Sequence, residues 1–219
     1  MFGLSDTHCH LNLKTAFQED FEEVLARAWE TGLDRILIPG IDLETSRLAV
    51  EMAERDDRIY AAIGVHPNDA LKWNEATRQD LMTLAGHPKV VAIGEIGLDY
   101  YRDHAPRDRQ LEILEIQLEM AASLELPVII HNRDAIHDLW PILREWQSQL
   151  VQAGNPLKAR PGVLHAYTED LPTALAIIDR SFFLGVGGPV TFKNARDRQE
   201  IVRALPLSSI LIETDAPYL

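Results

Sequence analysis

Short, nearly continuous runs of Ile, Val and Leu recur along the chain, separated by stretches with apolar residues at helical spacing. Such runs are typical of parallel strands that are buried on both faces, whereas surface helices carry one apolar stripe. The pattern predicts strands at 2–8, 34–39, 59–65, 89–95, 127–131, 161–166, 182–187 and 209–213. It predicts helices between them at 18–31, 43–55, 75–86, 106–124, 134–151, 170–179 and 195–204.

Regular alternation of strands and helices is typical of α/β proteins with a parallel sheet. With eight strands and no break in composition, it favours a (β/α)₈ TIM barrel forming a single domain over 1–219. An open, doubly wound sheet gives a similar pattern and stays an alternative at this point. The last predicted strand ends close to Leu219, so we expect the barrel to lack its last helix in this chain.

Composition narrows the class of protein. The 219 residues are 46% hydrophobic and 25% charged, as in a water-soluble globular domain. The net charge of −13 argues against a basic protein that coats DNA without sequence preference. Cys9 is the only cysteine, the chain starts without signal-peptide features, and no apolar run approaches the length of a membrane span. We expect a cytoplasmic protein with no membrane contact and no obligate protein partner.

The first predicted strand leads into two closely spaced histidines, in the sequence Asp6-Thr7-His8-Cys9-His10. Side chains alternate along an extended strand, so His8 and His10 point to one side and Cys9 to the other. Two imidazoles then converge on one point, either as a hydrogen-bonded surface pair or as metal ligands. Cys9 is expected to be a small buried hydrophobic residue.

Later predicted strands also end in side chains of the kinds that bind metals. These are His66, Glu95, His131, His165, and the neighbouring carboxylates Glu213 and Asp215. In a TIM barrel the carboxyl ends of all strands face one mouth, so residues far apart in sequence become neighbours. By contrast, His87, His104 and His137 fall in a loop or on a helix, where we expect exposed side chains.

Six of these residues form the predicted ligand set, namely His8, His10, Glu95, His131, His165 and Asp215. Six ligands exceed the needs of one catalytic tetrahedral ion and suit two divalent ions that share a carboxylate, with Glu95 as the bridge. Imidazole with carboxylate favours Zn²⁺, Mn²⁺ or Fe²⁺ over an all-oxygen Mg²⁺ or Ca²⁺ cage, although Mg²⁺ stays a candidate. Two such ions activate a bridging hydroxide for hydrolysis, and Asp215 is placed to move its proton.

Motifs along almost the whole chain resemble those of the TatD family of metal-dependent hydrolases, within the amidohydrolase-like superfamily. They are DTHCHL at 6–11, GVHP at 64–67, GEIGLDY at 94–100, HNR at 131–133, GGPVTFKN at 187–194 and ETDAP at 213–217. The resemblance implies a TIM barrel with a divalent-metal site. It also implies a deoxyribonuclease, acting as a 3′-to-5′ exonuclease on the phosphodiester bonds of single-stranded DNA ends.

Carried over position by position, the family's metal ligands fall on the same six residues, with Glu95 and Asp215 also in catalytic roles. The resemblance further implies that His66, Arg133 and Lys193 contact the phosphate of the substrate. After His165 the chain departs from the family pattern, because Glu169 and Asp170 stand where a turn containing glycine is expected.

Two other functions remain open from the sequence. An amidohydrolase acting on a small ester, amide or lactone uses the same hydroxide on a carbonyl group, although many such enzymes bridge their metals with a modified Lys rather than a Glu. A catalytically silent metal-binding scaffold is the third possibility, since a barrel without its last helix exposes apolar surface.

Overall fold

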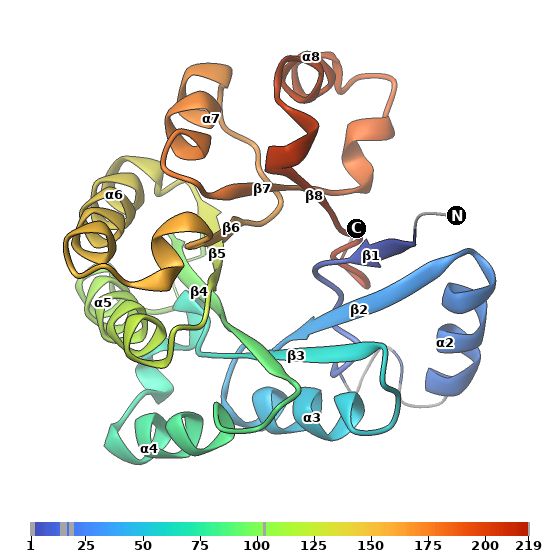
Figure 1. Cartoon of the computed structure of the whole chain (residues 1–219), viewed down its shortest axis with the longest axis horizontal. Coiled ribbons are helices and arrows are strands. Elements are labelled where there is room, and N and C mark those ends of the chain that lie inside the picture. The colour runs from blue at the N-terminus through green and yellow to red at the C-terminus, as the bar shows by residue number, and fades with distance from the viewer. Residues whose placement is uncertain (1–2, 14–16, 18–19, 103, 219) are drawn as a thin grey trace.

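The computed structural model describes residues 3–13, 17, 20–102 and 104–218. Its strands form one sheet in the order β1 to β8, which matches their order along the chain (Figure 1). Every pair of neighbouring strands is parallel. The strands are β1 Leu4–Asp6, β2 Leu33–Pro39, β3 Ile59–Ile63, β4 Val90–Asp99, β5 Val128–Arg133, β6 Gly162–Leu164, β7 Phe183–Val186 and β8 Ile210–Ile212.

Helices connect successive strands and surround the sheet in Figure 1. The α-helices are α2 Phe21–Glu30, α3 Leu43–Ala53, α4 Glu75–Leu84, α5 Arg107–Leu124, α6 Ile136–Gln152, α7 Leu171–Ile178 and α8 Arg196–Ala204. Short 3₁₀ helices are η1 Pro67–Lys72, η2 Pro156–Ala159, η3 Gly188–Thr191 and η4 Leu207–Ser209. Within the described residues, no helix combines the length and the apolar character needed to cross a membrane.

The first and last strands meet, which distinguishes a barrel from an open doubly wound sheet. The backbone N–H of Thr7 donates a hydrogen bond of 3.1 Å to the carbonyl of Ile212, and the Thr7 hydroxyl donates to the same carbonyl. Further along, the N–H of Asp215 donates to the carbonyl of His8 at 2.8 Å. The predicted TIM-barrel fold is therefore confirmed, with the two ends of the chain joined beside the carboxyl ends of the strands.

Apolar side chains fill both sides of the sheet. One cluster takes a residue from each strand except β1, and such a ring fills the interior of the barrel. It consists of Leu37, Ala62, Ala92, Ile129, Val163, Phe183 and Leu211. A larger cluster packs the outer face against the helices, and includes fully buried Ile38, Leu114 and Leu139. Because continuous apolar runs supply both faces, the strands have the composition expected for a parallel sheet.

Several strand boundaries differ from the prediction, and two of the differences affect the site. The first strand ends at Asp6, so His8 and His10 lie in the loop after it rather than on the strand. The fourth strand continues to Asp99, four residues past the predicted end at 95. The polar Glu95 interrupts the apolar pattern of β4 but does not end the strand. At this point the pairing of β4 with β5 is irregular, between Ile93 and Ile96. Residues 2, 18 and 19, at the edges of predicted elements, lie outside the described part of the chain.

Candidate metal centre

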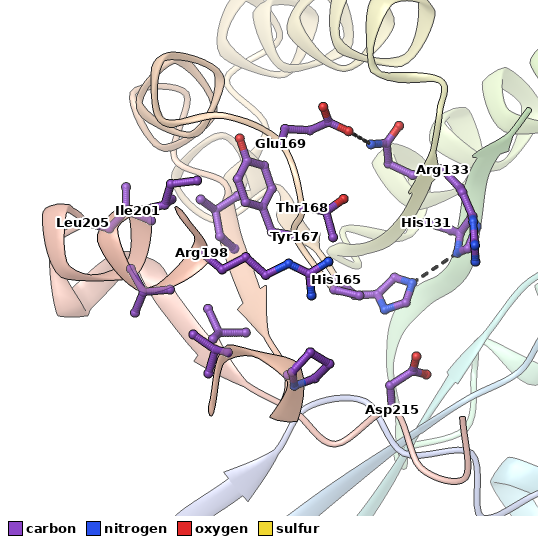
Figure 2. Close-up of a pocket in the computed structure, with 18 of the residues that line it drawn as sticks. His131, Arg133, His165, Tyr167, Thr168, Glu169, Arg198, Ile201, Leu205 and Asp215 are labelled. Carbon is purple, nitrogen blue, oxygen red and sulfur yellow. Dashed lines mark hydrogen bonds between the residues drawn. The ribbon is translucent and has the colours of Figure 1, made fainter. Parts of the chain in front are cut away.

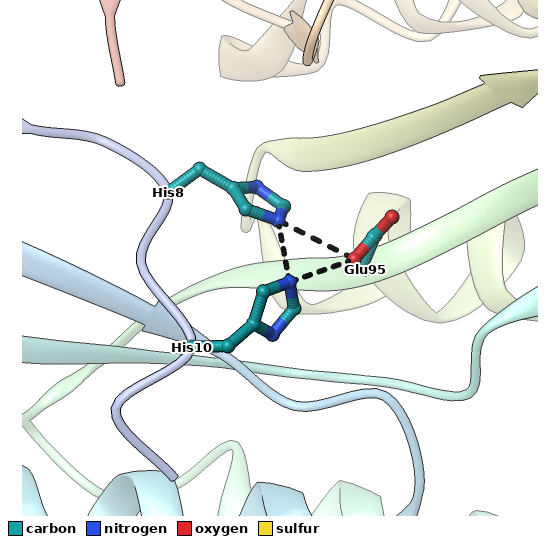
Figure 3. A group of neighbouring side chains, drawn as sticks. All are labelled: His8, His10 and Glu95. Atoms are coloured by element: carbon teal, nitrogen blue, oxygen red, sulfur yellow. Dashed lines mark hydrogen bonds and ion pairs between the residues drawn. The ribbon is translucent and has the colours of Figure 1, made fainter. Parts of the chain in front are cut away.

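Three buried side chains converge where the loop after β1 passes the middle of β4 (Figure 3). The Nε2 atoms of His8 and His10 lie 3.0 Å apart. The Oε2 atom of Glu95 lies 3.3 Å from His8 Nε2 and 3.5 Å from His10 Nε2. Two ring nitrogens and one carboxylate oxygen therefore face a common point, as the sequence predicts for this pair of histidines.

The other oxygen of Glu95 faces a second pair of histidines. Its Oε1 atom lies 2.7 Å from His131 Nδ1 and 2.8 Å from His165 Nε2, and these two nitrogens are 3.2 Å apart. The rings of His8 and His165 stack with their centroids 4.0 Å apart. Glu95 thus sits between two pairs of imidazoles, with one oxygen directed at each.

Asp215 reaches the cluster from the loop after β8. Its Oδ1 atom lies 3.5 Å from His10 Nε2 and 3.8 Å from His8 Nε2. The loop is fixed by Asp6 at the end of β1, which accepts hydrogen bonds from the backbone and the hydroxyl of Thr214. All six predicted ligands therefore lie in one cluster, although they span the chain from residue 8 to 215.

Two further carboxylates border the cluster. The Oδ2 atom of Asp99 lies 3.3 Å from His131 Nε2, and Asp99 could hold an ion together with His66 and His131. Glu213 accepts a hydrogen bond from the backbone of Ala166 and could hold an ion together with His8 and His165. Asp99 was missed because the predicted strand stopped at 95. Glu213 follows β8, as Asp215 does, but nothing in the sequence pattern distinguishes Glu213 as a metal ligand.

Two buried glutamines on α5 hold the ends of neighbouring strands. The Gln117 side chain accepts a hydrogen bond from the N–H of Val65 at 2.7 Å and donates to its carbonyl at 3.0 Å, which fixes the backbone next to His66. Gln110 bonds in the same way to the N–H and the carbonyl of Asp99. Spaced seven residues apart, the two amides lie on one face of the helix.

Burial and neighbouring charges set the protonation of the histidines differently. Burial lowers the pKa of His8 to about 4, so its ring is neutral at pH 7. Burial also lowers the pKa of His10, but Asp215 and Glu95 outweigh it and raise that pKa to about 9. For His131 burial is likewise outweighed, here by Asp99 and Glu95, and the pKa rises to about 9.

The carboxylates of the cluster differ in the same way. Burial raises the pKa of Glu95, yet His165 and the other imidazoles around it hold the pKa well below its usual range. Glu213 has fewer positive neighbours, and burial raises its pKa to about 7. Glu95 therefore stays ionised in the centre of the cluster, where two groups of imidazoles compete for its charge.

The predicted phosphate-contacting residues occupy three different settings. The Nε2 atom of His66 lies 3.5 Å from Glu95 Oε1, within the cluster. Arg133 lines a cavity beside the cluster, with its guanidinium 4.2 Å from the ring centroid of Tyr101. Lys193 is exposed on the loop before α8 and is not among the residues lining that cavity.

Two of the three histidines predicted to be exposed are exposed. His104 and His137 are exposed, as expected for a loop and a helix surface. His87 is an exception, because it is partly buried with its Nε2 atom 3.1 Å from Glu54 Oε1. Cys9 is buried as predicted, and burial raises the pKa of its thiol to about 12. Cys9 is therefore not a reactive thiolate at neutral pH.

A family model described as TatD related DNase matches residues 5–219. The chain belongs to the TatD family. Its fold and its cluster of imidazoles and carboxylates are accordingly those of a metal-dependent hydrolase, and the resemblance noted in the sequence is confirmed.

Individual TatD relatives are similar over nearly the whole chain. The uncharacterized metal-dependent hydrolase YabD from Bacillus subtilis is 43% identical over 216 residues, which cover 99% of this chain and 81% of that protein. The 3′-5′ ssDNA/RNA exonuclease TatD from Shigella flexneri is 35% identical over 204 residues, which cover 93% of this chain and 75% of that protein. The crystal structure of YjjV, a TatD homolog from Escherichia coli K12, is 32% identical, covers 98% of this chain and 79% of its own, and superimposes with a TM-score of 0.87.

The spacing of the cluster fits the divalent ions that this TatD protein requires. Metal–ligand bonds of 2.0–2.1 Å at tetrahedral angles place neighbouring ligand atoms about 3.3 Å apart. The observed separations among His8, His10 and Glu95 are 3.0–3.5 Å. Within the described residues, the buried Oδ1 atom of Asp215 also has no hydrogen-bond donor, as expected of an atom that awaits a cation. The nitrogen and oxygen donors suit Zn²⁺, Mn²⁺ or Fe²⁺.

Proposed function

We propose that the chain is a 3′-to-5′ exonuclease that hydrolyses phosphodiester bonds at single-stranded DNA ends with two divalent ions. His8 and His10 would hold one ion with Oε2 of Glu95 and with Asp215, and His131 and His165 the other with Oε1 of Glu95. The observation that carries this assignment is the position of Glu95, whose two oxygens face two different pairs of imidazoles.

Ions held by these residues would supply an activated water at neutral pH and would neutralise charge on the phosphate oxygens. Asp215 lies within 3.5–3.8 Å of His10 and His8, and would take the proton of the attacking water and deliver it to the leaving oxygen. Glu95 stays ionised in this setting because the surrounding imidazoles lower its pKa. It therefore contributes a permanent negative charge between the two ion positions.

The nucleic-acid substrate is proposed from relatives. The TatD protein of Shigella flexneri is named a 3′-5′ ssDNA/RNA exonuclease, and it aligns with 93% of this chain. A net charge of −13 disfavours tight binding of a long duplex, whereas a frayed strand needs few contacts. His66, Arg133 and Lys193 are the proposed phosphate contacts, and the cytoplasm is the proposed location.

The test joins metal content to DNA cleavage. Elemental analysis of wild-type protein is expected to give about two ions per chain, and Glu95→Gln, which keeps the shape but loses the charge, about one or fewer. Glu119→Gln makes the same chemical change at an exposed position of α5 and is expected to keep both ions. A 5′-labelled single-stranded oligonucleotide should be shortened stepwise by wild type and Glu119→Gln only.

Other outcomes would redirect the proposal. Two ions per chain without cleavage of DNA or RNA, together with rapid cleavage of small esters or lactones, would favour the amidohydrolase alternative. Cleavage that Glu95→Gln leaves unchanged would contradict the role given to the carboxylate bridge.

A further inference from the structure

A cavity opens beside the cluster and extends away from it, between the loop after β6, η3 and α8 (Figure 2). Its volume is about 410 Å³, within the usual range of small-molecule sites. His131, His165 and Asp215 line its inner end, so a ligand in the cavity lies directly against the proposed ion positions.

Arg198 is the cation of α8 that enters this cavity. Figure 2 shows its side chain extending from α8 across the cavity toward His165. Within the described part of the chain, the guanidinium has no hydrogen bond and no ion pair. By comparison, Arg133 on the opposite wall lies over the ring of Tyr101, and the cavity carboxylate Glu169 already accepts a hydrogen bond from Asn132 at 2.8 Å. Arg198 therefore offers five uncommitted donors beside the cluster.

Helix α8 is held firmly enough to orient this arginine. The Gln199 side chain donates hydrogen bonds of 2.9 Å and 3.1 Å to the carbonyls of Val190 and Phe192, which tie the helix to η3. On the next turn Ile201 packs against the apolar core. The position of Arg198 at the cavity is therefore fixed by contacts that do not involve its own side chain.

Beyond Arg198 the cavity becomes apolar. Apolar lining side chains come from the end of β7, from η3, and from α8 and the residue after it, and are Val186, Pro189, Val190, Ile201, Val202 and Leu205. A ligand that fills the space thus places an anionic group near Arg198 and the cluster, and an apolar or aromatic group against these side chains. A nucleotide has both parts.

We infer that this cavity is the binding subsite for the terminal nucleotide of the substrate, with Arg198 contacting its phosphate and the η3–α8 wall packing against its base. The inference rests on the proposed nuclease function and adds the residue and the surface that recognise the strand end. It also gives the acidic protein a local positive contact for an anionic substrate.

The experiment compares Arg198→Ala and Arg198→Lys with Arg203→Ala in the metal-loaded enzyme. Arg203 is exposed on the same helix and does not line the cavity, so its removal controls for the loss of one charge. For Arg198→Ala we expect KM for a single-stranded oligonucleotide to rise about tenfold, with a smaller change in kcat. Arg198→Lys keeps the positive charge, so its KM should lie between those of wild type and Arg198→Ala. The slope of log KM against log salt should fall by about 0.7, the value for one phosphate contact.

Calorimetry separates the base from the phosphate and is independent of turnover. Wild type should bind thymidine monophosphate more tightly than deoxyribose 5-phosphate, and Arg198→Ala should weaken both. Equal binding of the two ligands, no binding by wild type, or equal effects of Arg198→Ala and Arg203→Ala would each overturn the inference. If oligonucleotides are not cleaved but thymidine monophosphate binds as expected, the proposed nuclease function fails while the subsite stands.

Discussion

Replacing Gln117 with Leu tests whether the amides on α5 hold the strand ends that carry the site. The substitution keeps a similar volume but removes both hydrogen bonds to Val65, at 2.7 Å and 3.0 Å. Gln117 is 1% exposed and Val65 is equally buried, so water cannot replace the lost partner. The backbone N–H and C=O of Val65 would therefore both be left unsatisfied in the protein interior.

The expected cost follows from those two orphaned groups. Each unsatisfied buried group costs about 1–3 kcal/mol, and the apolar Leu returns part of this, so we expect a loss of about 3 kcal/mol in the free energy of unfolding. For a chain of this size 1 kcal/mol shifts Tm by about 2–4 °C, which gives a fall of about 6–12 °C. Because His66 follows Val65 directly, the damage should also reach the cluster.

Differential scanning calorimetry of the metal-free protein measures the fall, and elemental analysis after reloading shows whether the cluster keeps its ions. Gln149→Leu on α6 is the control, since that side chain is exposed and makes only a 3.4 Å hydrogen bond to a neighbour. A Tm for Gln117→Leu within about 2 °C of both wild type and control would refute the reasoning, because an unsatisfied pair must cost more than that.

Three other predictions concern the cluster. Removing the ions with a chelator should lower Tm, because ligand at 100 times its Kd stabilises the fold by about 2.7 kcal/mol, and a Tm that ignores the chelator would contradict the proposed site. Metal affinity, measured by competition with a chelating dye, should rise from pH 6 to pH 9. Asp215 and Glu95 outweigh burial and raise the pKa of His10 to about 9, and an imidazole must lose its proton to bind an ion. An affinity that does not change with pH would contradict the assignment of His10 as a ligand. Thr214→Val removes the 2.7 Å hydrogen bond to Asp6 and should cost about 1 kcal/mol in urea unfolding, with no loss expected for the exposed Thr83→Val.

The fold was predictable because its signal is repeated. Eight apolar runs separated by amphipathic stretches give the number and order of strands, and the helix predicted at 106–124 is found at Arg107–Leu124. The polar Glu95 hid the continuation of β4 to Asp99, because a pattern of apolar residues cannot distinguish a strand end from a functional side chain within a strand. Closure into a barrel depends on long-range hydrogen bonds such as Thr7 to Ile212, which have no local signal.

The clustering of the candidate ligands was predictable where several strands carry the same kind of residue toward or just past their carboxyl ends. His8, His10, His131 and His165 follow that rule, and the shared mouth of a barrel brings them together. Arg198 does not, because it lies on a helix in a charged segment where any of several arginines could face solvent. Only the packing of α8 against η3 determines which of them enters the cavity.

The junction of β1 and β8 has a consequence for biosynthesis. Asp215 leaves the ribosome more than 200 residues after His8 and His10. Since the N–H of Asp215 bonds to the carbonyl of His8, the two ends are brought together only when the eighth strand is in place. A nascent chain therefore cannot present the whole cluster, and a hydrolytic centre assembled in this way stays incomplete until translation has passed the last ligand.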